Sequence, residues 1–125
     1  MAKSLHVLVV EDDDDVRDSL RMVFDAFGYR VSVAEDAAAA RITLARRDVD
    51  LLLTDEMMPG ERGRHLAAYA RTIDVPALLM SADNETKNEF AGGQQSFIGK
   101  PFQVGQLREA VEKVMAKQKV DADGD

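Results

Sequence analysis

The chain has 125 residues and a formal net charge of −7 at pH 7, with 46% hydrophobic and 31% charged residues. This is the size and composition of one ordinary globular domain, and its acidity argues against direct binding to nucleic acid or an anionic membrane surface. The chain has no cysteine, which excludes disulfides, thiolate metal sites and cysteine nucleophiles and fits a reducing compartment.

The first half of the chain alternates between strand and helix patterns. The apolar run from Leu5 to Val10, broken only by His6, predicts a strand that is covered on both faces. Apolar residues then recur at helical spacing from Val16 to Phe27, and Gly28 favours a helix end there. The remaining elements expected in this half are a strand over Arg30–Ala34, a helix over 37–47 capped by Asp36, and a buried strand over Leu51–Thr54.

The second half continues the alternation. The elements expected here are a helix from Leu66 to Ile73, a strand over Ala77–Met80, a short helix over 84–91, a strand over Ser96–Ile98 and a helix from Val104 to Met115. Strands that alternate with helices predict an α/β domain with a parallel five-stranded sheet and helices on both faces. We expect this domain to occupy residues 1–120, followed by a flexible tail over 121–125.

Chemically suited residues stand where four of the apolar runs end. They are Glu11 with Asp12, then Asp55, Ser81 and Lys100. The carboxyl ends of parallel strands lie along one edge of a sheet, and ligands bind there, so these residues are expected to meet in one pocket. Three carboxylates, a hydroxyl and an ammonium form a site that can handle a phosphoryl group.

Clustered carboxylates indicate a cation site. Glu11 and Asp12 at the end of the first strand would repel each other unless a cation neutralised them, and oxygen ligands of this kind suit Mg²⁺. The next three acids, residues 13–15, instead fit the first turn of a helix, where they cap free amides. Asp55 could attack phosphorus to form an aspartyl phosphate. Taken alone, Asp55 and Ser81 would equally fit turns, and Lys100 a solvated surface.

Four segments resemble the receiver domain of two-component response regulators, including the chemotaxis receivers. They are Val9-Val10-Glu11-Asp12-Asp13, Leu53-Thr54-Asp55-Glu56-Met57-Met58-Pro59-Gly60, Met80-Ser81-Ala82 and Lys100-Pro101-Phe102. The resemblance covers nearly the whole chain. It implies a flavodoxin-like (βα)5 fold with a doubly wound parallel sheet.

The resemblance also implies roles for the acidic residues. Asp55 would be the phosphoacceptor. Mg²⁺ would be bound by Asp12, Asp55 and the backbone carbonyl of Met57, with Glu11 completing the acidic pocket.

The remaining site residues are assigned in the same way. Ser81 and Lys100 would contact the phosphoryl oxygens, and the peptide bond between Lys100 and Pro101 would be cis. Ser81 and Phe97 would form the switch, although an aromatic residue in a short strand also fits plain core packing. The segment from Ser81 to Lys100 is short for the family, so we expect Asp83 to Gln95 to be dynamic and the usual signalling face to be altered.

The function implied is a response-regulator receiver, acting as a single-domain regulator or a phosphorelay intermediate. It would take a phosphoryl group from a histidine kinase or a histidine phosphotransfer protein and signal to a downstream protein by conformational change. It would be no enzyme beyond its own phosphorylation and dephosphorylation. We expect a cytoplasmic monomer that binds neither nucleic acid nor membrane directly.

Three alternatives remain open at this stage. The chain could be the receiver fragment of a larger regulator. A haloacid-dehalogenase-type phosphatase also uses an aspartyl nucleophile and Mg²⁺, but it would need a second aspartate where Met57 stands. A docking module that is never phosphorylated would lack the acceptor, the metal acid or the lysine, and none is missing. The two histidines add little, because His65 fits an exposed helix position and His6 a strand edge.

Overall fold

A single parallel sheet forms the centre of the molecule. The computed structural model describes residues 4–82 and 95–123. The five strands have the order β2-β1-β3-β4-β5, and all four neighbouring pairs are parallel. Their bounds are β1 His6–Val10, β2 Arg30–Ala34, β3 Leu51–Asp55, β4 Ala77–Ser81 and β5 Ser96–Gly99. The predicted fold class is confirmed.

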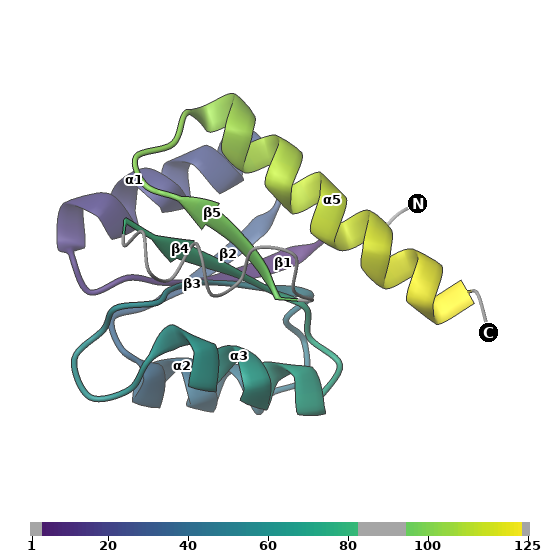
Figure 1. The fold of residues 1–125 in the computed structure, drawn as a ribbon, viewed down its shortest axis with the longest axis horizontal. Helices are drawn as coiled ribbons and strands as arrows, with labels where there is room; N and C mark the ends of the chain where they lie inside the picture. Colours follow the sequence, from purple (N-terminus) through teal and green to yellow (C-terminus); the bar gives the residue numbers. More distant parts are fainter. Residues whose placement is uncertain (1–3, 83–94, 124–125) are drawn as a thin grey trace.

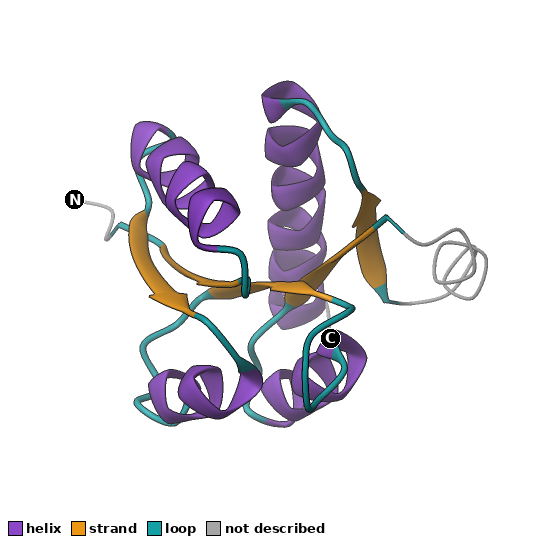
Figure 2. Ribbon diagram, turned by 90° about the vertical axis from the view of Figure 1, so that its left-hand side faces the viewer, coloured by secondary structure: helices purple, strands orange, loops and turns teal. Residues whose placement is uncertain are grey.

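Helices cover both faces of this sheet (Figure 1). In the described part of the chain they are α1 Asp14–Ala26, α2 Ala37–Leu44, α3 Gly63–Thr72 and α5 Val104–Asp123. Helices α1 and α5 lie on one face, and α2 and α3 lie on the other, as Figure 2 shows in a view turned by 90°. The helix expected over 84–91, and all of the expected dynamic segment except Gln95, lie outside the described residues.

The two faces of β1 explain why its sequence is apolar from Val7 to Val10. Side chains alternate across a strand, so Val7 and Val9 belong to the core under α1 and α5, whereas Leu8 and Val10 belong to the core over α2 and α3. All four side chains are fully buried. A strand covered on both sides has no polar face, as the uninterrupted run of apolar residues predicts.

Local signals set three of the helix ends in the described part of the chain. The Asp13 carboxylate accepts a hydrogen bond from the amide of Val16 at 3.0 Å and caps α1, and Asp36 does the same for Ala39 of α2 at 2.8 Å. Gly28, with a φ of 93°, follows α1 in the left-handed region. Helix α2 ends at Leu44, earlier than expected, and the chain then reverses through Arg47 at a φ of 65°.

Two expectations differ from the structure. Helix α5 continues to Asp123, so residues 121–123 of the expected tail are helical, because no glycine or proline interrupts the sequence between Gly105 and Gly124. His6 does not lie at an exposed edge. It is buried beside Ser32, whose Oγ lies 2.7 Å from His6 Nε2, because β1 has β2 and β3 on either side. His65 is exposed, as expected.

Candidate functional site

The register of the sheet brings the polar strand ends to one edge. Val10 pairs with Thr54, so Glu11 and Asp55 follow at the same level of neighbouring strands. On the other side of β3, Asp55 pairs with Met80. Lys100 lies at the same edge, beside the end of β4, because its amide donates a hydrogen bond to the carbonyl of Ser81 at 2.8 Å. The fold therefore gathers the predicted site residues from four separate segments.

Lys100 connects the two buried acids of this site. Its Nζ lies 3.0 Å from Glu11 Oε1 and 3.1 Å from Asp55 Oδ1. Glu11 is 2% exposed and Asp55 is 8% exposed, so neither carboxylate is fully hydrated. Buried charges require partners, and one ammonium here serves both carboxylates.

The pKa values of the two buried acids, Asp55 and Glu11, shift in opposite directions. Burial raises the pKa of Asp55 to about 6, against the lowering effect of Lys100 and with a further increase from the charge of Glu11. Burial alone would also raise the pKa of Glu11, but hydrogen bonds from the amide of Asp13 and from Lys100 outweigh it, and the pKa of Glu11 is lowered. Burial opposes the charged form of Lys100, yet its two acidic partners raise its pKa. Two carboxylates around one ammonium leave excess negative charge.

This negative charge is placed where a cation could bind. Ligand oxygens of Glu11, Asp12 and Asp55 all lie within 4.8 Å of one another. Asp12 is exposed, so the cluster opens to solvent on that side. Oxygen ligands with room for water are what Mg²⁺ requires, so the donor set fits this ion. Met57, the fourth expected contributor, follows Asp55 by two residues and has a half-exposed side chain.

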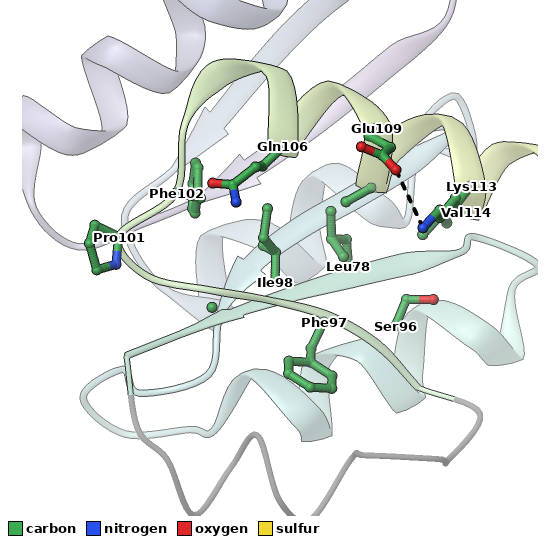
Figure 3. A pocket seen from close by; sticks show the side chains of 12 residues that line it. Leu78, Ser96, Phe97, Ile98, Pro101, Phe102, Gln106, Glu109, Lys113 and Val114 are labelled. Carbon is green, nitrogen blue, oxygen red and sulfur yellow. Dashed lines mark ion pairs between the residues drawn. The ribbon is translucent and has the colours of Figure 1, made fainter.

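The expected switch residues lie on β4 and β5. Ser81 is 1% exposed at the end of β4. Phe97 on β5 is half-buried, and in Figure 3 its ring lies on the side of the strand away from α5, whereas Ile98 points towards α5. The peptide bond between Lys100 and Pro101 is cis, as the resemblance implies.

A separate cavity lies along β5 and α5, on the α5 side of the sheet. It has a volume of about 450 Å³ and is lined among others by Leu78, Ile98, Phe102 and Val114, with Lys113 and Glu109 at its border (Figure 3). None of the three clustered acids contributes to its lining. Most of its lining residues belong to β5, to α5 and to the loop between them, and Leu78 belongs to β4.

Two residues beside the end of β3 were not identified from the sequence. Glu56 is a completely buried carboxylate that pairs with Arg64 and Arg62. Gly63 begins α3 against the backbone of Asp55, where an added Cβ would lie 2.1 Å from the Asp55 carbonyl oxygen. The sequence does hold a signal for Glu56. It is a charged residue directly after a buried strand, and arginines follow it at short distance. The sequence holds no comparable signal for the second.

Comparison with known proteins supports the same interpretation. The family model described as the response regulator receiver domain matches residues 7–112. The protein PetR of Rhodobacter capsulatus is 36% identical over 106 residues, covering 82% of this chain and 45% of PetR. The phosphate regulon transcriptional regulatory protein PhoB of Pseudomonas aeruginosa is 30% identical over 118 residues, covering 89% of this chain and 52% of PhoB.

A solved structure is similar as well. The receiver domain of the hybrid histidine kinase CckA is 30% identical, with a TM-score of 0.73, and the match covers 88% of this chain and 98% of that domain. The chain spans about half the length of PetR and PhoB. The haloacid dehalogenase alternative is thereby set aside. In the described part of the chain, no helix is long and apolar enough to cross a membrane.

Proposed function

The chain belongs to the response regulator receiver family, and on this premise we propose that Asp55 accepts a phosphoryl group from a phosphohistidine. In this step an Asp55 carboxylate oxygen bonds to phosphorus while the bond between phosphorus and the histidine nitrogen breaks. The single observation that carries the proposal is the placement of Lys100 between Glu11 and Asp55, at 3.0 and 3.1 Å. An acceptor held beside an ammonium is suited to a reaction that depends on positioning and charge neutralisation.

Each residue of the pocket has a distinct task in this proposal. Asp55, whose pKa is about 6, is mostly ionised at pH 7 and is available as the nucleophile. The raised pKa of Lys100 keeps its ammonium charged, so that it can hold a phosphoryl oxygen when Asp55 is modified. Ser81, buried at the end of the next strand, would bind a second phosphoryl oxygen. The pocket thus provides a nucleophile and two groups that orient its product.

Mg²⁺ is the cofactor that we propose for this site. Glu11, Asp12 and Asp55 would hold it with their clustered oxygens, and the Met57 carbonyl would complete the set. When bound, the ion supplies positive charge that offsets the carboxylates and the incoming phosphoryl oxygens. The amide of Asp13 donates a hydrogen bond to Glu11 Oε2 at 3.2 Å, which orients this carboxylate.

The signal would leave the site through Ser81 and Phe97. Movement of the Ser81 side chain towards the phosphoryl group would free space for Phe97, and β5 with α5 would present the change to a downstream protein. The other partner would be a histidine kinase or a histidine phosphotransfer protein. We propose a cytoplasmic monomer that contacts neither nucleic acid nor membrane directly and has no enzymatic activity beyond its own phosphorylation and dephosphorylation. Its receiver domain comprises residues 1–120, with α5 extending it to Asp123.

The test is the intact mass of the protein after incubation with acetyl phosphate and Mg²⁺. We expect one phosphate adduct on the wild type and none on Asp55→Asn. Since some receivers ignore small donors, a phosphorylated histidine kinase is the second donor. A wild type that stays unmodified with both donors, or an adduct that persists in Asp55→Asn, would refute the proposal.

A further inference from the structure

Glu56, the residue after Asp55, is an ionisable side chain with no exposed surface. A carboxylate is rarely buried so completely unless its oxygens are bound by partners. Among the described residues, the partners of the Glu56 carboxylate come from the start of α3, and they are distinct from Lys100, which binds Asp55 and Glu11. Glu56 therefore serves a different purpose from the acids of the pocket.

Three different groups of Glu56 form hydrogen bonds. Its amide donates to the carbonyl of Met80 at 2.8 Å and extends the ladder between β3 and β4 beyond Asp55. Its carbonyl accepts from the amide of Gly63 at 2.9 Å. Its carboxylate accepts from the amide of Arg64 at 2.8 Å and from Arg64 Nε at 2.5 Å. One residue thus attaches the start of α3 to the end of the acceptor strand.

The same helix start presses on the acceptor itself. A Cβ on Gly63 would lie 2.1 Å from the carbonyl oxygen of Asp55 and 2.9 Å from the Asp55 carbonyl carbon. A contact this close leaves no room for a side chain at Gly63 and sets a short separation between α3 and the end of β3. The carboxylate of Glu56 spans that separation, because it reaches from the strand end to the amide of Arg64 inside the first turn.

From these contacts we propose that Glu56 is a positioning residue, whose side-chain length fixes where α3 sits and thereby the orientation of Asp55. The effect runs through the backbone, since Glu56 binds neither Lys100 nor the clustered acids. The inference rests on the proposed role of Asp55 for its rate measurement. Its Mg²⁺ measurement requires no phosphorylation.

The experiment compares Glu56→Gln with Glu56→Asp. Glutamine keeps the length and one acceptor oxygen for the Arg64 amide but loses the charge, whereas aspartate keeps the charge but is shorter by one methylene. We expect Glu56→Gln to be phosphorylated by acetyl phosphate within about twofold of the wild-type rate. For Glu56→Asp we expect a loss of about tenfold at saturating donor, since displacements near 1 Å can cost up to about 100-fold.

The control is Glu61→Asp, which shortens the acid of a more exposed ion pair, with Arg41, in the same loop. It should leave the phosphorylation rate unchanged. The acetyl phosphate concentration at half saturation should stay constant in all variants, because Glu56 does not face the donor. Mg²⁺ affinity, followed by amide chemical shifts of the folded proteins, should fall in Glu56→Asp alone.

The outcomes separate positioning from a merely structural role. If Glu56→Asp lowers only the urea midpoint and keeps both the saturated rate and the Mg²⁺ affinity, the proposal is wrong. It is equally wrong if Glu56→Gln loses as much as Glu56→Asp, because side-chain length without the charge would then not be enough to position α3. If the wild type accepts no phosphoryl group, the proposed function fails, and the Mg²⁺ comparison still decides the role of Glu56.

Discussion

The ammonium of Lys100 reaches across β4 to lie 3.1 Å from the carboxylate of Asp55. Lys100 follows β5 and Asp55 ends β3, so the two residues come from strands that do not pair with each other. Their ion pair also includes Glu11, on a third strand end. The charge balance of the pocket therefore depends on the relative placement of the whole strand edge, and four predictions follow from its details.

Removal of the Lys100 ammonium is expected to destabilise the protein. In Lys100→Met, Glu11 and Asp55 lose their shared cation and face each other with little solvent to screen them. We expect the free energy of unfolding in Mg²⁺-free buffer at pH 7 to fall by about 1 to 3 kcal/mol. Lys113→Met is the matched control, since the ion pair of Lys113 with Glu109 is exposed and should contribute less than about 0.5 kcal/mol. Equal urea midpoints for the two variants would contradict the prediction.

The pH dependence of stability should reveal the raised pKa of the buried Asp55 carboxyl. Because the pKa of Asp55 is about 6, above its ordinary value of 3.8, the folded state holds this proton more tightly than the unfolded state. The contribution is fully present below pH 3.8 and is lost as the pH rises through 6. Without Mg²⁺, the wild type should lose about 1 kcal/mol relative to Asp55→Asn between about pH 5 and pH 7. Parallel unfolding curves for the two proteins would show that the pKa of Asp55 is not raised.

Mg²⁺ is expected to raise the melting temperature at pH 7. Binding to the folded state alone stabilises by about 2.7 kcal/mol at 100 times the dissociation constant. Asp12→Ala should remove most of this effect, because Asp12 is the exposed member of the cluster and has no ammonium partner of its own among the ion pairs of the described residues. Asp15→Ala, in the first turn of α1 and outside the cluster, should retain it. A melting temperature that ignores saturating Mg²⁺ would count against the metal site.

Gly63 should tolerate no side chain. In Gly63→Ala the new Cβ would meet the carbonyl of Asp55 at 2.1 Å, so α3 must shift, and we expect a loss of at least about 1 to 3 kcal/mol. Gly105 in the first turn of α5 has open space around it, so Gly105→Ala should be neutral or should stabilise by up to about 1 kcal/mol. Urea unfolding of the two variants measures the difference. Similar changes in both would mean that the contact at Gly63 relaxes easily.

The sequence carried enough information to predict the strands and the gathering of the site. Buried parallel strands are short apolar runs, and the residues at their ends must share an edge, so Glu11, Asp55 and Lys100 could be placed together without coordinates. Helix ends were less predictable. Asp13 and Asp36 were visible as caps, but the end of α2 at Leu44 depends on Arg47 adopting a left-handed conformation, which its sequence does not demand.

The complete burial of Glu56 could not be predicted for a different reason. The nearby arginines indicate an ion pair, but the burial depends on how α3 packs against the strand end, and local spacing does not encode that tertiary arrangement. The role of Gly63 could not be predicted either. A glycine after a proline-containing loop predicts a turn, whereas here Gly63 is the first residue of α3. The burial of His6 follows from the order of strands in the sheet, which places β1 between two neighbours and which the local sequence around His6 does not encode.

Strand β5 lies at the edge of the sheet, where a partner protein could bind it and sense the charge of the site. The two buried acids lie at the ends of the inner strands β1 and β3. The balancing ammonium follows β5, which within the described part of the chain pairs with β4 alone. A protein that binds β5 and α5 could therefore affect the position of the Lys100 ammonium without contacting the carboxylates of Glu11 and Asp55. Coupling between two sites is reciprocal. If a change in the charge of Asp55 alters the affinity of that protein, binding of the protein must alter the free energy of the same change at Asp55 by an equal amount.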